Sequence, residues 1–327
     1  MNISRPGRLA VSPLSLTLIA APALSQDGTG LRGTLSFDQR FDYSDNPDLL
    51  VFPDDGKITA TTGLRFNLSS ETRTETFNFN IGAEGIGAFG DGATDADDFD
   101  FRNESTGGSY SRDGSNSRLS LSASYSNRDI EDDVFGFFVD GEFDPDALII
   151  DGGQRRLTQY RLGFQNGLEG PFGIELNARA RDVEFVGTTD PELVNSENRS
   201  VDAVARLQLN RALTARVLTG FSDRDVSDAL QTERSNSYVG YGLEGETAGG
   251  FTFTGDLTID QSKTSELGTV VTDRDGVGIS LSAAQEQNNG TLGVTLTSRI
   301  DDSGRRTSAN VSRSFELPNC ALSLSLG

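Results

Sequence analysis

The feature that most constrains this sequence is a run of apolar residues at every second position. It is clearest in VDAVARLQLNRALTARVLTGFSD, residues 201–223, where apolar residues occupy most odd positions on both sides of a short break. Successive side chains of a β-strand point to opposite faces, so the spacing predicts a hairpin of two long strands. The even positions are mostly polar, with Val204 and Leu218 as exceptions. A soluble sheet with one wet face explains this hairpin as well as a membrane sheet does.

The rest of the chain repeats the pattern in about 15 segments, many of them near the 9–11 residues that a tilted strand needs to cross a bilayer. One segment, residues 100–110, alternates too weakly for its apolar face to be assigned. A soluble sheet of this size would need a large core. Only 35% of the residues are hydrophobic, however, so the composition favours a barrel with lipid outside and water inside.

The links between the segments alternate in length, which favours a membrane barrel further. Outer-membrane barrels have short turns at the periplasmic end and long loops at the outer end. The longer, acidic or Gly/Asn-rich links are 44–57, 85–101, 126–153, 186–199, 223–234, 260–275 and the shorter 301–306, and between them lie 69–75, 113–117, 166–171, 210–212, 244–250, 285–290 and 316–319.

This alternation predicts a direction for each strand, with the first rising from the periplasm and the fifteenth ending outside at Gly327. Single-chain bacterial barrels have an even number of strands, so we expect about 16 strands and a truncated C-terminal end. The expected fold is all-β, a transmembrane antiparallel up-and-down β-barrel that occupies residues 26–327. The last segment also lacks the terminal aromatic residue usual in such barrels.

The N-terminus predicts export. Residues 1–25 contain Arg5 and Arg8, a modest apolar run and then small residues, the layout of a secretory signal peptide. No stretch of 18 apolar residues could form a spanning helix, and Cys320 has no cysteine to pair with in the chain. We therefore expect the outer membrane as the location, and lipid and lipopolysaccharide as partners.

The charge excludes nucleic acid as a partner. The formal net charge is −21, and removal of residues 1–25 takes away two arginines and no acids, giving 26 − 49 = −23. An enzyme is also not expected. Outer-membrane hydrolases use histidine as a general base, and the chain has none.

The opening of the expected barrel, LRGTLSFDQR followed by FDYSDNPDL at residues 31–49, resembles a putative outer-membrane β-barrel porin family. In that family the first strand ends in an aromatic residue and Asp-Asn. The resemblance implies a porin-like barrel, and some members are associated with exopolysaccharide export. A plain turn is the other interpretation of Asp45, Asn46 and Pro47.

Charged residues on the polar faces are the candidate site. All basic residues except Lys57 and Lys263 are arginines. Charged side chains inside a pore can sort solutes by charge, whereas the same side chains in cross-strand pairs would only stiffen the wall. The two interpretations are compatible. The candidate pore-lining residues are Arg161, Glu175, Arg179, Arg181, Asp202, Arg206 and Arg216.

Two acidic links, 91–100 and 129–146, have enough oxygen ligands for calcium but lack the glycine spacing of a helix-loop-helix calcium site. We expect solvated charge there, with loosely held divalent cations that bridge to lipopolysaccharide, and no cofactor. Three functions remain open: a porin-like channel for small hydrophilic solutes, a non-conducting scaffold or accessory barrel of exopolysaccharide export, and a soluble secreted β protein. Homo-oligomers are compatible with the first two.

Overall fold

The structure is a computed structural model of the 327-residue chain, and it describes residues 30–44, 57–89, 100–130, 138–139, 142–143, 152–287, 289–301, 303–317 and 320–326. The predicted signal peptide lies outside these residues. So do most of the acidic links 91–100 and 129–146, and the Asp-Asn-Pro of the first long link.

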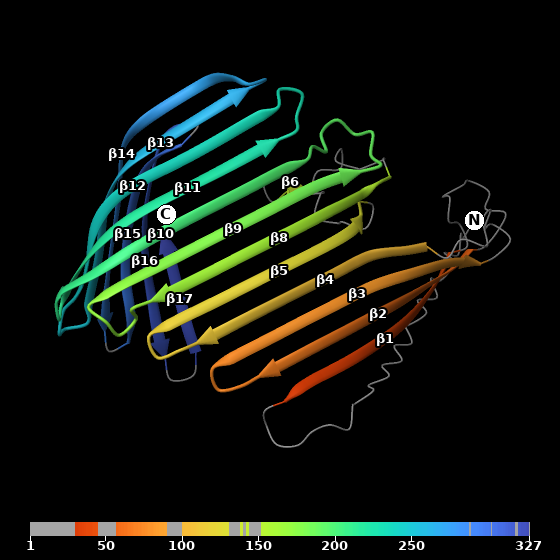
Figure 1. The fold of residues 1–327 in the computed structure, drawn as a ribbon, viewed down its shortest axis with the longest axis horizontal. Helices are drawn as coiled ribbons and strands as arrows, with labels where there is room; N and C mark the ends of the chain where they lie inside the picture. Colours follow the sequence, from red (N-terminus) through yellow and green to blue (C-terminus); the bar gives the residue numbers. More distant parts are fainter. Residues whose placement is uncertain are drawn as a thin grey trace, which may run out of the picture. The chain divides into compact units, whose positions relative to one another are not determined.

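The described chain is all β, with 15 antiparallel strands in one sheet whose spatial order is the order of the sequence (Figure 1). A separate two-stranded sheet, β6–β7, lies within the predicted link 126–153. The strands are β1 Leu31–Ser44, β2 Lys57–Glu71, β3 Glu75–Phe89, β4 Asp100–Asp113, β5 Ser117–Asp129, β6 Phe138–Val139, β7 Glu142–Phe143, β8 Gln154–Asn166, β9 Phe172–Val186, β10 Ser196–Asn210, β11 Leu213–Val226, β12 Thr232–Glu246, β13 Phe251–Glu266, β14 Thr269–Gln287, β15 Gly290–Asp301, β16 Gly304–Leu317 and β17 Cys320–Leu326.

The chain divides into two compact units. Unit 1 comprises Met1–Ser109, Ser124–Arg156 and Val186–Thr189. Unit 2 comprises Tyr110–Ala123, Leu157–Phe185 and Asp190–Gly327. Unit 1 therefore holds β1 to β3, and unit 2 holds the whole of β10 to β17 and nearly all of β9.

In unit 1 the register aligns the apolar positions of neighbouring strands. Leu35 pairs with Phe66, which pairs in turn with Ile81. Apolar cross-strand neighbours of this kind stabilise a sheet face. In β4 the left-handed φ of 56° at Asn103 interrupts regular strand geometry. This irregularity explains why the sequence pattern did not assign a face to residues 100–110.

In unit 2 the aligned apolar side chains form a continuous face, here named the apolar face. Across four successive strands, Val217 pairs with Tyr241, Tyr241 with Leu257, and Leu257 with Ile279. The apolar positions of β11 run from Leu213 to Phe221, which is roughly 26 Å along the strand at about 3.3 Å per residue. The hairpin predicted at 201–223 is confirmed as β10–β11.

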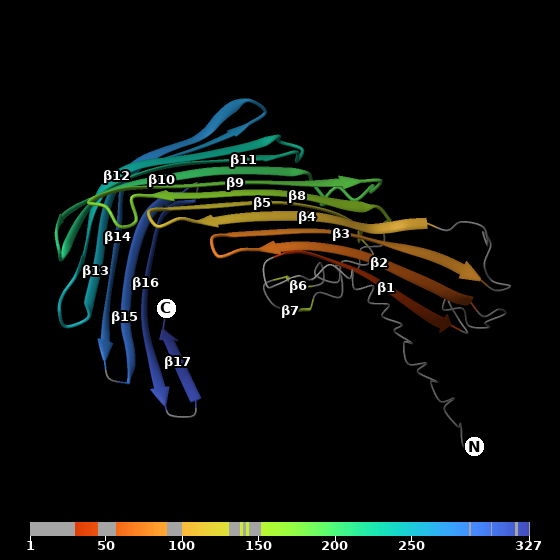
Figure 2. The same ribbon diagram turned by 60° about the horizontal axis from the view of Figure 1, so that its bottom comes forward.

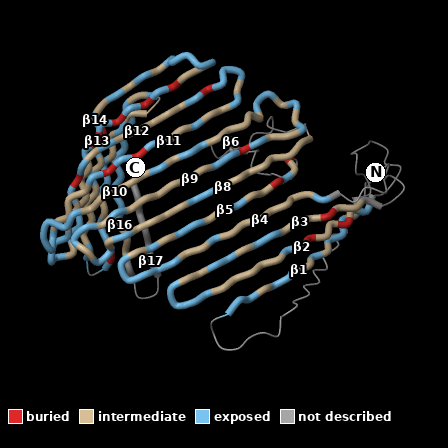
Figure 3. The backbone as a smooth tube through the Cα atoms, in the orientation of Figure 1, coloured by how far each residue is buried: buried red, intermediate tan, exposed pale blue. Residues whose placement is uncertain are grey.

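Few residues of this sheet are buried (Figure 3), and burial in unit 2 is inverted relative to a soluble protein. Val217 is 58% exposed, and Tyr241 and Ile259 are each 65% exposed, although all three lie on the apolar face. The side chains that are most buried on β13 are polar. They alternate with exposed neighbours along the strand and are Thr258, Asp260, Ser262 and Thr264.

Unit 2 bends sharply, so that β13 to β16 run steeply away from β9 to β11 in Figure 2. Glycines on the polar face permit a bend toward that face. A Cβ on Gly240 or Gly242 would overlap the backbone of β13, and one on Gly278 would overlap Thr258 and Asp260. Glycine in a strand often marks a close backbone approach or a corner of this kind. The polar face is therefore the concave one.

The predicted links need correction in the second half of the chain. The expected long link 260–275 is a two-residue turn, Leu267–Gly268, and both residues have positive φ, as in a type I′ hairpin turn. The predicted links 223–234 and 301–306 are likewise shorter in the structure, where they comprise only residues 227–231 and 302–303. Ladder hydrogen bonds involve only the backbone, so strands continue as polar hairpins after their apolar alternation ends.

The prediction of an all-β antiparallel up-and-down sheet is confirmed, and so is the weak fourth strand. Closure into a barrel of about 16 strands is not seen. β1 and β17 are the two ends of the strand order, and among the described residues no pairing joins them. A barrel requires that last pairing, so the observed fold is an open 15-stranded sheet.

Candidate functional site: the charged polar face

The polar face of unit 2 brings two arginines directly opposite each other. Arg206 on β10 pairs with Arg216 on β11 in the register. Like charges opposite each other destabilise a sheet unless other groups compensate them. Each guanidinium here has a carboxylate partner on the strand that lies on the side away from the other arginine. Arg206 forms a hydrogen-bonded ion pair with Glu175 of β9.

Arg216 lies between two carboxylates. Its Nη1 is 3.4 Å from Oε2 of Glu244 on β12, and its Nε is 3.9 Å from Oδ1 of Asp256 on β13. The second contact crosses a whole strand, and Gly242 stands between the two partners in the register. A side chain at Gly242 would overlap Asp256, so the glycine makes this long contact possible.

A second set of side-chain contacts crosses β11 in the same way. The Tyr238 hydroxyl of β12 donates a 2.7 Å hydrogen bond to Oδ1 of Asp202 on β10. Gly220 lies between them, where a Cβ would collide with both. The Arg299 guanidinium of β15 lies over the Tyr238 ring, 5.5 Å from its centroid, within the range of a cation–π contact.

The buried part of the polar face lies at the bend between β13 and β15. Asp260 is 5% exposed and accepts a 2.5 Å hydrogen bond from Thr258 and a 3.3 Å bond from the backbone N–H of Ile300. β15 pairs with β14 only as far as Ser298. Beyond that residue β15 reaches β13 across the glycines of β14, which narrows the space inside the bend.

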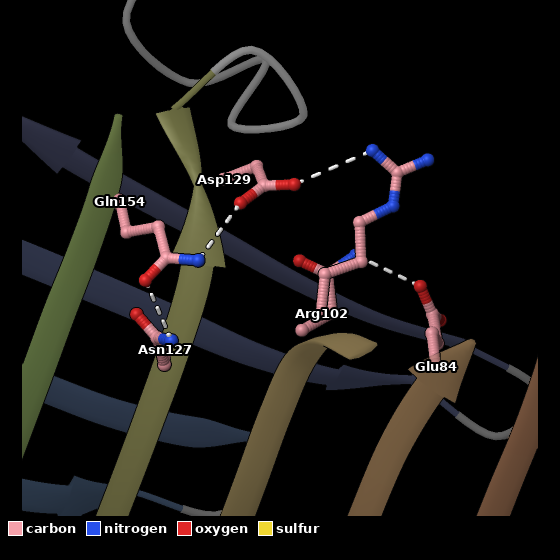
Figure 4. A network of polar contacts seen from close by, with 6 residues as sticks. Glu84, Arg102, Asn127, Asp129 and Gln154 are labelled. Atoms are coloured by element: carbon pink, nitrogen blue, oxygen red, sulfur yellow. Dashed lines mark hydrogen bonds and ion pairs between the residues drawn. The ribbon is translucent and has the colours of Figure 1, made fainter. Parts of the chain in front are cut away.

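Unit 1 has its own polar network, which joins β3, β4, β5 and β8 (Figure 4). Nη1 of Arg102 is 3.3 Å from Asp129, which also accepts a 3.5 Å bond from Gln154. Asn127, only 6% exposed, donates to Gln154 and to Glu104. Asn103 donates to Glu84. The network stiffens the strand ends next to the link that follows β5.

The turn between β11 and β12 is organised by Asp228. Its Oδ1 accepts bonds from the backbone N–H groups of Leu230 and Thr232, and its Oδ2 accepts a 2.7 Å bond from the Thr232 hydroxyl. The hydroxyl bond is the largest cause that lowers the pKa of Asp228 below its usual value of 3.8. The ionised carboxylate therefore stabilises this turn.

The seven candidate pore-lining residues separate into two groups. Glu175, Asp202, Arg206 and Arg216 lie together in the polar network of unit 2. Arg161, Arg179 and Arg181 are exposed, and within the described part of the chain none of the three has a carboxylate partner.

Sequence reasoning missed Tyr238, Glu244, Asp256 and Asp260. Their contacts depend on register and on strands that are not neighbours, which alternation alone does not reveal. A usable signal was present, because Gly220, Gly240, Gly242 and Gly278 stand at polar-face positions where a strand would ordinarily carry side chains. Glycines there indicate that a neighbouring side chain or backbone occupies the space.

No metal-binding group of three or more His, Cys, Asp or Glu residues occurs in the described ranges. None of the described segments forms a helix long and apolar enough to span a membrane. In comparisons with known proteins, no protein-family model matches the sequence, and no curated protein matches it either.

Proposed function

We propose that this chain is a porin-like β-barrel of the outer membrane that passes small hydrophilic solutes. The observation that carries the proposal is the inverted burial of unit 2, with an exposed apolar face and a concave, charged polar face. Monomeric soluble proteins rarely expose large contiguous apolar patches. Lipid would cover the apolar face, and water and solutes would occupy the concave side.

The dimensions support this assignment. The apolar stretch of β11, Leu213–Phe221, has nine residues, which is within the roughly 9–11 residues that a tilted strand needs to cross the hydrocarbon core of a bilayer. The strands continue past this apolar stretch as polar hairpins, as the 19-residue β14 does. Sheet closure, location in the outer membrane and export by residues 1–25 belong to the proposal, as do lipid and lipopolysaccharide as partners.

A non-conducting scaffold is the second candidate, because the polar face contains groups that reach across strands. Arg299 reaches the Tyr238 ring, and Ile300 reaches Asp260. Both contacts narrow the concave side of unit 2. If such contacts fill the interior, the barrel would support a surface assembly such as polysaccharide export rather than a water-filled path.

Electrophoresis and single-channel recording test these candidates together. The protein is extracted from the outer-membrane fraction and run in SDS with and without boiling. A closed barrel resists SDS, so we expect faster migration of the unboiled sample. We then expect discrete conductance steps in a planar bilayer. A mobility shift without conductance would support the scaffold. Recovery of the protein in the soluble fraction with no shift would contradict both candidates.

A further inference from the structure

A cavity of about 330 Å³ opens on the polar face of unit 2, at the end of the sheet where β8 turns into β9. Its wall combines that turn with the start of β9, the end of β10, the start of β11 and the end of β12. Its size is at the lower end of the range for small-molecule sites, which suits a solute of one or two sugar rings. The side chains that line it include Gln165, Glu175, Arg206, Gln208, Thr214 and Glu244.

The turn that forms one wall is held in place. The backbone N–H groups of Gly167 and Leu168 donate to the Asn116 carbonyl, and the Glu169 N–H donates to the Asn116 side chain at 3.1 Å. The N–H of Gln208 donates to the Pro171 carbonyl at 2.7 Å. Gly167 has a φ of 77°. A wall fixed by these bonds needs little reorganisation when a ligand binds.

The charges within the cavity wall are paired, apart from the exposed Glu169 of the turn, whose carboxylate has no ion-pair partner among the described residues. Glu175 pairs with Arg206, and Glu244 pairs with Arg216 next to the cavity. Gln165, Gln208 and Thr214, in contrast, make no side-chain hydrogen bond with other described residues. Amide and hydroxyl groups both donate and accept hydrogen bonds. They match a ligand whose own groups do the same, namely the hydroxyls of a sugar.

We propose that this cavity is a subsite for a neutral polyhydroxylated solute of hexose size. The inference deepens the proposed channel function by naming a solute class, and it rests on that function only for its role in permeation. No aromatic side chain lines the described cavity, so ring stacking does not add to the affinity. We therefore expect weak binding, which suits a solute that must also leave.

Saturation-transfer NMR on the full chain in deuterated detergent tests the proposal without a bilayer. The probes are glucose, the diamine putrescine and acetate. We expect saturable transfer to glucose, with putrescine and acetate at least about tenfold weaker. Saturable binding of putrescine without glucose would overturn the proposal in favour of a cation site. Binding of no probe would overturn it outright.

Variants locate the site. Gln165→Leu combined with Gln208→Leu removes two uncommitted amides, and we expect glucose affinity to fall about tenfold or more. Thr254→Val, on the polar face outside the cavity, is the matched control and should bind like the wild type. Thr214→Val replaces the double variant if that variant does not fold.

Unchanged glucose affinity in the folded double variant or in Thr214→Val would contradict this location. Conductance without glucose binding would support the channel proposal and exclude the subsite. Glucose binding by a protein that does not conduct would exclude the channel and retain the subsite.

Discussion

At the scale of single residues, glycines decide which polar side chains can meet. Gly220 is almost enclosed by Tyr238 and Asp202, and Gly242 by Asp256 and the backbone of β13. In an ordinary strand these positions would carry side chains, and the contacts across β11 and β12 would not form. Loss of side-chain packing at a glycine is therefore compensated by a hydrogen bond or an ion pair that crosses it.

The substitution Gly220→Ala tests this arrangement. The new methyl group must displace Tyr238 or Asp202, which breaks their hydrogen bond, so we expect a loss of about 1–3 kcal/mol in the free energy of unfolding. Urea titration of the refolded protein in detergent measures it. Gly108→Ala, where a Cβ meets only ordinary van der Waals contacts, is the control and should change little. Equal losses in both variants would contradict the explanation.

The pH dependence of the β11–β12 turn follows from Asp228. The folded pKa of this carboxyl is lowered, so its contribution to stability is full above its usual pKa of 3.8. The contribution is lost as the pH falls through the lower folded pKa. We expect the amide of Thr232 to lose protection from hydrogen exchange in that acidic window, measured relative to amides elsewhere in β12.

The variant Asp228→Asn is the control for this effect, because its amide does not titrate. Its turn should show weaker protection at neutral pH and no specific change between pH 5 and the acidic window. Wild-type protection that stays constant through that window would show that the ionised Asp228 does not hold the turn.

At the scale of strands, alternation predicted the faces well and the strand ends poorly. Val217 and Ile259 lie on the exposed apolar face, as the sequence pattern indicated. The pattern stopped at about residue 260, yet β13 extends to Glu266, because polar residues pair through their backbones as well as apolar residues do.

The candidate site was predicted in part for a similar reason. Arg206 and Glu175 belong to adjacent strands, so their proximity followed from the predicted hairpins. The contact of Arg216 with Asp256 skips a strand and depends on Gly242 and on the bend, neither of which follows from a period of two. Sequence patterns therefore located neighbours within a hairpin but not partners across the curved face.

Two adjacent residues of β14 test which face meets lipid. Leu281 is 48% exposed on the apolar face, and Ser282 points to the polar face. In a membrane sheet Leu281→Arg places a charge in hydrocarbon, which we expect to cost about 2–4 kcal/mol near the midplane. Ser282→Arg should be tolerated. Folding yield into lipid vesicles and urea titration measure both, and the reverse order of effects would contradict the lipid assignment.

At the scale of the whole molecule, what covers the apolar face distinguishes a membrane protein from a soluble secreted one. Val217, Tyr241 and Ile259 are each more than half exposed on strands that pair side by side. At about 25 cal/mol per Å² of apolar surface, a face of this kind has a strong tendency to be covered. Lipid, detergent or further copies of the chain can cover it, but water cannot.

We therefore expect residues 26–327 to be monodisperse in detergent above its critical micelle concentration and to associate when the detergent is removed. Size-exclusion chromatography with light scattering measures both states. Hydrophobic association weakens on cooling and does not depend on charge screening, so the associated form should persist in high salt. Dissociation by salt would assign the association to charged surfaces instead. A stable monomer in detergent-free buffer would show that the apolar face is covered within the chain itself, which would contradict the membrane proposal and leave the soluble β protein.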